Sequence, residues 1–276
     1  MNRKKLLQIA IILVIFGVSV FYLQDRLIFI PSPWPQSFTL PERLDNCNLT
    51  EIFFDTTDGQ TLHAVKAEPF SGKAKHIILF SHGNAGNIVH RLNKTDHLCK
   101  LGFSVFLYDY RGYGKSTGRP TVAGTFLDGE AALDYVINKE KYQKKQIILY
   151  GESLGTGISA HLIGSDPNAF AGLVHESGFA SLGAQANRRF PFIGSLLLKK
   201  DMPSLATISH YRGKLMVIHS KSDETIPISD SEMIFEACPS PEKRFVVLER
   251  AKHNDPVWKN KIYQDAWTSF KYSLDN

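Results

Sequence analysis

The chain has 276 residues, of which 43% are hydrophobic and 21% charged, an ordinary globular composition that excludes disordered and low-complexity proteins. The formal net charge is +5, but residues 1–26 carry +3 of it, which leaves residues 27–276 at only +2. A domain with a net charge this close to zero lacks the excess of basic residues that is typical of nucleic-acid-binding proteins. The three cysteines form no C-x-x-C pair and no metal-like cluster, so we expect neither a disulfide scaffold nor a bound metal.

The first element expected is a hydrophobic helix. After Met-Asn-Arg-Lys-Lys an uncharged run extends from Leu6 to Leu23, which is long enough to cross a thin bilayer. We expect residues 1–24 to form a transmembrane signal anchor, because Gly17-Val18-Ser19 is a poor signal-peptide cleavage site. A cleaved signal peptide and a buried helix are the alternatives. The cationic N-terminus predicts a cytoplasmic start and an extracytoplasmic location for everything after residue 26.

The rest of the chain predicts one α/β domain. Residues 25–47 contain four prolines and are expected to form an extended linker, followed by a domain over 48–276. Short apolar runs predict eight strands: Ile52–Asp55, Leu62–Ala67, His76–Phe80, Ser104–Tyr108, Gln146–Tyr150, Gly172–His175, Leu215–His219 and Phe245–Leu248. Between them helices are expected near 87–100, 123–139, 154–164, 229–237 and 257–273. This alternation predicts a mostly parallel sheet flanked by helices.

A long interval, 178–212, separates two of the predicted strands. Insertions of this kind are often lids over a site, and we expect a short lid here. Its aromatic and aliphatic residues are interleaved with arginines and lysines. Two interpretations stay open: an amphipathic helix that covers the sheet edge, or an apolar acyl pocket with a basic rim.

The strongest chemical motif is Gly151-Glu152-Ser153-Leu154-Gly155, a G-x-S-x-G sequence. A nucleophile elbow needs a strand before the serine and a helix after it, and Ser153 has both. A second copy surrounds Ser116, but it lies in a turn-rich segment and runs into Arg119-Pro120, so we interpret Ser116 as a loop serine. The same glycines fit neither a Walker loop nor a dinucleotide fingerprint.

A serine hydroxyl needs a base, and the base needs an orienting carboxylate. In proteins with this elbow the order along the chain is serine, acid, histidine, each just beyond a strand. Asp223 follows the strand Leu215–His219, and His253 follows Phe245–Leu248. Glu176 also ends a strand and is the alternative acid.

The tetrahedral intermediate of acyl transfer needs two N–H donors for its oxyanion. One candidate is the backbone N–H of Leu154, directly after the serine. The other is the backbone N–H of Asn84, in the glycine-containing loop 81–87 after the third predicted strand. A tight turn without a catalytic role is the alternative for this loop.

Five motifs in order carry a family resemblance: Ser-His-Gly-Asn-Ala-Gly-Asn from 81, Asp-Tyr-Arg-Gly-Tyr-Gly-Lys-Ser from 109, the elbow, Asp-Glu-Thr-Ile-Pro from 223 and His-Asn-Asp from 253. Together they resemble the α/β-hydrolase subfamily that contains protein depalmitoylases and serine-aminopeptidase-like hydrolases. The resemblance covers about residues 25–276 and implies an α/β-hydrolase fold. Its members act as esterases, thioesterases, lipases or peptidases.

These observations favour a membrane-anchored serine hydrolase that cleaves a carboxylic ester or thioester, with Ser153, Asp223 and His253 as its triad. The expected partner is a small or lipid-like acyl substrate, and no metal or organic cofactor is required. A serine peptidase or amidase is the first alternative. A non-catalytic, membrane-anchored binding module is the second.

Overall fold

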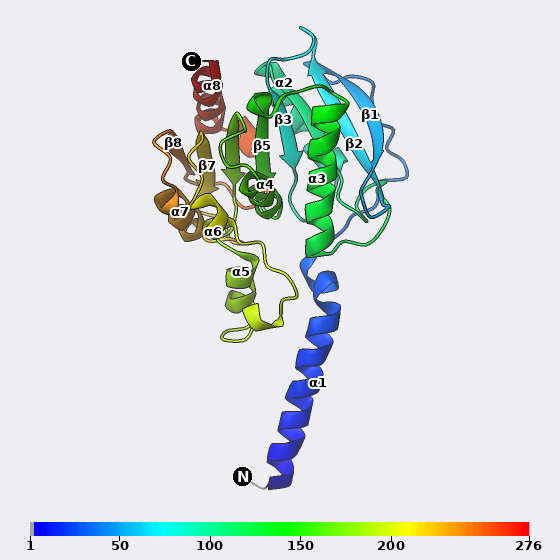
Figure 1. The fold of residues 1–276 in the computed structure, drawn as a ribbon, viewed down its shortest axis with the longest axis vertical. Coiled ribbons are helices and arrows are strands. Elements are labelled where there is room, and N and C mark those ends of the chain that lie inside the picture. Colours follow the sequence, from blue (N-terminus) through cyan, green and yellow to red (C-terminus); the bar gives the residue numbers. More distant parts are fainter. Residues whose placement is uncertain (1–2, 276) are drawn as a thin grey trace.

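The computed structural model describes residues 3–275, within which one sheet of eight strands has helices on both faces (Figure 1). The strand order is β1-β2-β4-β3-β5-β6-β7-β8. Pairing is antiparallel between β1 and β2 and between β2 and β4, and parallel between all later neighbours. The strands are β1 Cys47–Asp55, β2 Thr61–Pro69, β3 Ile77–Ser81, β4 Ser104–Tyr108, β5 Ile147–Glu152, β6 Gly172–Glu176, β7 Leu215–Ser220 and β8 Lys243–Leu248. The predicted mostly parallel, eight-stranded sheet is confirmed.

Each of the five predicted helices of the domain is present. The α-helices of the described chain are α1 Arg3–Ile28, α2 Leu92–Lys100, α3 Val122–Asn138, α4 Gly155–Gly164, α5 Leu182–Arg189, α6 Ser204–Ile208, α7 Ile228–Ala237 and α8 Lys261–Asp275. Short 3-10 turns accompany them: η1 Ile88–Arg91, η2 Lys144–Gln146, η3 Ser195–Leu197 and η4 Val257–Lys259. The helix α8 begins later than expected because Pro256 is followed by the turn η4, which ends before Lys261.

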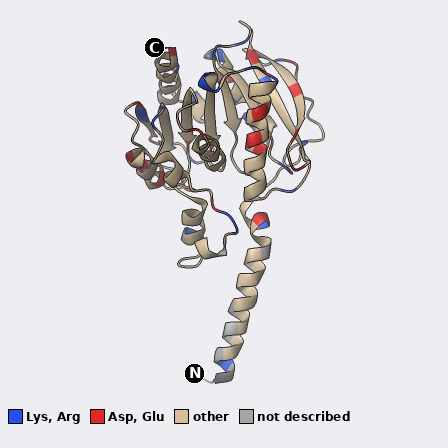
Figure 2. Ribbon diagram, viewed as in Figure 1, with Lys and Arg blue, Asp and Glu red and all other residues tan. Residues whose placement is uncertain are grey.

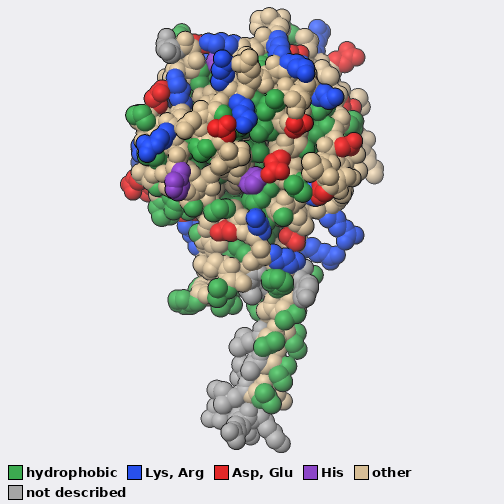
Figure 3. Space-filling view, in the orientation of Figure 1, with side chains coloured by type: hydrophobic (Ala, Val, Ile, Leu, Met, Phe, Trp, Pro, Cys, Tyr) green, Lys and Arg blue, Asp and Glu red, His purple; other side chains and the backbone are tan. Residues whose placement is uncertain are grey.

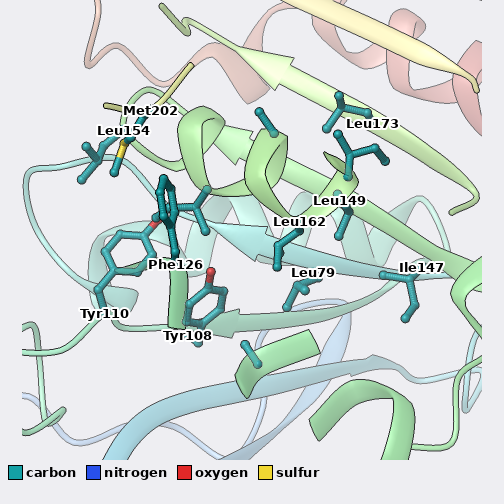
Figure 4. Close-up of a cluster of buried hydrophobic side chains, with 14 of the residues drawn as sticks. Leu79, Tyr108, Tyr110, Phe126, Ile147, Leu149, Leu154, Leu162, Leu173 and Met202 are labelled. Atoms are coloured by element: carbon teal, nitrogen blue, oxygen red, sulfur yellow. The ribbon is translucent and has the colours of Figure 1, made fainter. Parts of the chain in front are cut away.

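Two apolar layers hold the sheet between its helices. On one face, side chains of β3, β4, β5 and β6 pack against α3 and α4, as Figure 4 shows for Leu79, Tyr108, Leu149 and Leu162. On the other face, α2 and α8 cover the sheet, with Trp267 fully buried near the ring of Tyr150. Acidic and basic positions are interspersed over the domain (Figure 2).

The N-terminal segment forms α1, which projects from the domain (Figure 1). Within the described part of the chain, no helix is both long and apolar enough to cross a membrane. The transmembrane anchor predicted over residues 1–24, the first two of which lie outside the described residues, is therefore not supported. The extracytoplasmic location rested on this span and stays a prediction.

The segment predicted as a linker, 25–47, is attached along the domain. Its first residues continue α1 to Ile28, and the chain then pairs with the domain through the bridges Pro31–Gly86 and Pro33–Gly114. Trp34 and Phe38 pack against the apolar layer under α2 and α8. This apolar packing explains why a proline-rich segment lies on the body of the domain.

The insertion 178–212 contains two short helices, α5 and α6, joined through η3, where the sequence left an amphipathic helix as one of two interpretations. The helix α5 begins at a serine cap, with Ser181 Oγ accepting from the N–H of Ala184 at 3.0 Å. Met202 is fully buried and lies beside α4. At its other end the insertion is held by the N–H of Ala180, which donates to Asp230 Oδ2 at 3.1 Å. Its role as a lid stays a prediction.

The close approach of α4 to β3 yields a stability prediction. A methyl group on Gly155 would collide with the backbone carbonyl of Ser81, so Gly155→Ala should cost about 1–3 kcal/mol of unfolding free energy. In the control Gly164→Ala, the methyl would meet only the Thr207 side chain, at 3.1 Å, and the cost should stay below about 1 kcal/mol. Urea unfolding followed by circular dichroism measures both. Equal stability of the two variants would contradict the packing described.

Candidate active site

Ser153 occupies a sharp turn between β5 and α4. Its φ is +51°, in the left-handed region that non-glycine residues rarely adopt. Small neighbours make this turn possible, since a side chain at Gly151 would meet Ser159 Oγ and Thr156 Cα at 2.5 Å. The strand, strained serine and following helix have the geometry of a nucleophile elbow.

The structure brings Ser153, His253 and Asp223 together in one hydrogen-bonded chain. Ser153 Oγ lies 2.9 Å from His253 Nε2, and His253 Nδ1 lies 2.7 Å from Asp223 Oδ2. His253 comes from the loop after β8 and Asp223 from the loop after β7. Parallel strands end at the same edge of the sheet, which is why residues 70 and 100 positions from the serine reach it.

The imidazole of His253 is held in the tautomer that a base requires. Because ionised Asp223 only accepts, His253 Nδ1 carries the proton and Nε2 is left to accept from the serine hydroxyl. The backbone N–H of His253 donates to Glu224 Oε2 at 3.2 Å, which fixes the loop.

Asp223 is held by more than its contact with His253. Its Oδ1 accepts from the N–H groups of Thr225 and Ile226, each at 2.9 Å, and its side chain is fully buried. His219 Nε2 lies 3.2 Å from Asp223 Oδ2, and His219 Nδ1 lies 2.7 Å from Ser231 Oγ. Burial opposes ionisation of Asp223, but hydrogen bonds from His219 and His253 outweigh it and hold the pKa of Asp223 well below its ordinary value.

Both predicted oxyanion donors lie at the same cavity as the serine. Asn84 and Leu154 line this cavity, and neither backbone N–H donates to another residue of the described chain. The loop of Asn84 is rigidly tied, because its side-chain Oδ1 accepts from the N–H of Ile30 at 3.0 Å and from Tyr113 Oη at 2.7 Å. The two N–H groups are therefore available to an oxyanion near Ser153.

A buried ion cluster lies directly behind the serine. Lys94 Nζ contacts Glu152 Oε2 at 2.5 Å and Glu176 Oε1 at 2.6 Å. Arg91 Nη2 contacts Glu152 Oε1 at 2.8 Å, and its Nη1 donates to the carbonyl of Ala85 at 2.6 Å. Burial alone would raise the pKa of Glu152, but the two cations lower it far below its ordinary value.

The alternatives from the sequence occupy other places. Glu176, the alternative acid, binds Lys94 and accepts from Tyr150 Oη at 2.6 Å, and its carboxylate has no hydrogen bond to His253 among the described residues. Ser116 lies in the loop after β4, where its hydroxyl donates to the carbonyl of Asp109 at 2.8 Å and accepts from the N–H of His63. Geometry thus favours Asp223 as the acid and a structural role for Ser116.

Two hollows adjoin at His253. The larger has a volume of about 510 Å³, is mainly apolar and is lined by Ser153, with walls from α1, α5 and the loops after β3 and β7. The smaller, of about 410 Å³, is more polar than the first; Lys94, Glu176, Asp255 and Trp258 line it, and it shares His253 with the first. Among residues 3–275, no group of three His, Cys, Asp or Glu side chains is placed to hold a metal ion.

Comparison with known proteins assigns the chain to a family. Residues 72–209 match the family model described as serine aminopeptidase, S33. A Mycobacterium tuberculosis protein, Rv2307c, is 34% identical over 265 residues, which cover 94% of this chain and 91% of that protein. The chain belongs to this family of the α/β-hydrolase superfamily.

Other similarities support the same superfamily. The Arabidopsis thaliana α/β hydrolase domain-containing protein WAV2 is 28% identical over 263 residues, covering 88% of this chain and 85% of its own. Among solved structures, the Pyrococcus furiosus esterase Pf2001 superposes with a TM-score of 0.69 at 17% identity, over 89% of this chain and 96% of that one. At this identity the likeness to the esterase shows the fold alone.

The sequence did not predict two parts of the site of this hydrolase. His219 ends the predicted strand that precedes Asp223, and only its position four residues before the acid indicated a contact between the two side chains. Arg91 and Lys94 belong to none of the motifs found in the sequence. One signal was available, since the elbow contains an acidic residue, Glu152, next to the serine, and a buried carboxylate needs a cation.

The ion cluster predicts a large, pH-dependent effect of removing its ammonium group. Lys94→Met should cost about 3–5 kcal/mol of unfolding free energy near pH 7, because two buried carboxylates lose their shared cation. In the native protein the lowered pKa of Glu152 contributes stability that is present above its unfolded pKa and lost as pH falls. The difference between native protein and variant should therefore shrink as pH is lowered.

Lys221→Met is the matched control. Its ammonium pairs with Glu249 at 2.8 Å on the surface, and its loss should cost less than about 1 kcal/mol. Urea unfolding of both variants at several pH values measures the effect. An equal, pH-independent cost would contradict the role of the buried cluster.

Proposed function

We propose that this hydrolase cleaves carboxylic esters or thioesters through an acyl-enzyme on Ser153. The observation that carries the proposal is the chain from Ser153 Oγ through His253 to Asp223, with contacts of 2.9 and 2.7 Å, at the end of a mainly apolar cavity. Hydrolysis by a serine needs this arrangement of nucleophile, base and orienting acid.

In the first step Ser153 Oγ attacks the substrate carbonyl carbon while His253 Nε2 accepts the hydroxyl proton. The backbone N–H groups of Asn84 and Leu154 donate to the oxyanion that forms. His253 then gives its proton to the departing alcohol or thiol, and the acyl group stays on the serine. A water molecule loses a proton to His253, attacks the acyl-enzyme and releases the carboxylic acid.

The two hollows suggest where the parts of the substrate bind. The larger, mainly apolar hollow suits the acyl group. The smaller and more polar hollow beside His253 suits the leaving group, which must receive its proton from that residue. Asp223 stays ionised throughout, because hydrogen bonds hold its pKa low, and it stabilises the imidazolium that forms.

A serine peptidase or amidase is the second candidate, favoured by the match to the serine aminopeptidase model. Its leaving group is an amine, which departs less readily than an alcohol or thiol. Matched ester, thioester and anilide substrates of one acyl group distinguish the candidates, and faster anilide cleavage would favour the peptidase. If the protein hydrolyses none of the three substrates, the result would favour the remaining alternative, a non-catalytic binding module.

Replacement of triad residues tests the mechanism. Ser153→Ala should lower kcat by about 10⁴-fold, and Asp223→Asn by about 10²–10⁴-fold, because the members act as a unit. Ser116→Ala, in the second G-x-S-x-G copy, is the matched control and should change kcat by less than about tenfold. Near-native activity of purified Ser153→Ala, free of contaminating esterase, would disprove the triad. A greater loss of kcat in Glu176→Gln than in Asp223→Asn would indicate that Glu176, at the end of β6, is the acid of the triad.

A further inference from the structure

The end of α1 lines the larger hollow, through Gln24, Leu27 and Ile28. Gln24 is only 3% exposed, and its Oε1 accepts from the backbone N–H of Lys199 in the insertion at 2.8 Å. The ring centroids of Phe16 and Phe190 lie 6.3 Å apart in an edge-on arrangement. Figure 1 shows the same neighbourhood, with α5 and the loop after it beside the domain-facing part of α1. The helix α1 is thus packed against the insertion, 175 residues away in sequence.

The same end of α1 is fixed to the loop of the proposed oxyanion donor. Asn84 Nδ2 donates to the carbonyl of Ile28 at 2.6 Å, and the N–H of Ile30 donates to Asn84 Oδ1 at 3.0 Å. Attachment at two sides gives the helix end a defined position relative to Ser153. A wall that is positioned in this way can discriminate between ligands by size.

This wall is mainly apolar on the side of the hollow, although Gln24, Gln185 and Arg189 also line it. Leu27 and Ile28 of α1 line it, and Ala186, Phe190 and Leu198 of the insertion line it as well. Leu27 is 63% exposed although it lines the hollow, so its side chain leaves apolar surface unburied until a ligand covers it. Figure 3 shows hydrophobic side chains gathered along α1 and on the lobe beside it. The volume of about 510 Å³ is far larger than an acetyl group requires.

We infer that α1 is a specificity element of the active site: with the insertion it forms a subsite for an acyl chain much longer than acetyl. The inference rests on the proposed function and adds the substrate class, acyl esters or thioesters with an extended aliphatic acyl group. A chain that extends from the carbonyl at Ser153 passes between Leu27 and Ala186 and buries methylene groups against both walls. Each buried methylene raises kcat/KM by up to about fourfold.

The test compares acetyl and octanoyl esters of one alcohol with the full-length protein. The native enzyme should prefer the octanoyl ester by at least about tenfold in kcat/KM. Leu27→Trp and Ala186→Trp, one in each wall, should lower the ratio of octanoyl to acetyl ester kcat/KM by about tenfold or more. Leu23→Trp is the matched control, since Leu23 lies one turn earlier on α1, is 46% exposed and does not line the hollow.

Three outcomes would overturn the inference: a native preference for the acetyl ester, an unchanged preference in Leu27→Trp, or an equal loss in Leu23→Trp. The affinity of the protein for octanoate, measured by calorimetry, tests the subsite without any turnover. If the native protein hydrolyses neither ester, the proposed function is wrong, and the binding data decide on the subsite alone. Octanoate binding that Leu27→Trp weakens and Leu23→Trp preserves supports the subsite, and no binding by the native protein overturns it.

Discussion

The left-handed backbone of Ser153 is the constraint on which the site depends. A φ of +51° costs roughly 1 kcal/mol or more for a serine, so surrounding contacts must hold it. The Ser153 N–H donates to the carbonyl of Glu176 on the neighbouring strand at 2.9 Å, and the Ser153 carbonyl accepts from Thr156 at 3.0 Å. Gly155 lets α4 approach β3 closely enough for the turn to close. The strain places Oγ at the carboxyl edge of the sheet, where His253 meets it.

The ion cluster extends this constraint to the loop of Asn84. Glu152 precedes the serine, and Arg91 joins its carboxylate to the carbonyl of Ala85, next to Asn84. Asn84 in turn binds the end of α1 through its side chain. Ser153, the loop of Asn84 and the end of α1 are therefore connected by short polar contacts.

Sequence patterns predicted those features that depend on neighbouring residues or on strand ends. The elbow is a contiguous motif, and Asp223 and His253 could be proposed because parallel strands deliver their following loops to one edge. The contact of His219 with Asp223, and the contact of Lys94 with Glu176 across 82 residues, depend on packing between elements that no local pattern encodes. In the insertion the sequence left an amphipathic helix open without bounds, and the positions of α5 and α6 depend on their packing.

The N-terminal helix makes contacts that its sequence pattern did not indicate. Its last turns contact the insertion and the loop of Asn84, 175 and 56 residues away in sequence. Leu27, near the end of the helix, lines the larger hollow. These contacts join distant segments, so no local pattern of apolar residues predicts them.

The central claim is that Ser153 is a nucleophile activated by His253. The most direct measurement is the reaction of the full-length protein with a fluorophosphonate, followed by peptide mass spectrometry to locate the adduct. The account predicts one phosphonylated residue, Ser153, and at least about a hundredfold slower labelling in His253→Gln, because the serine hydroxyl loses its base. An adduct on Ser116, no adduct at all, or equally fast labelling of the His253→Gln variant would contradict it.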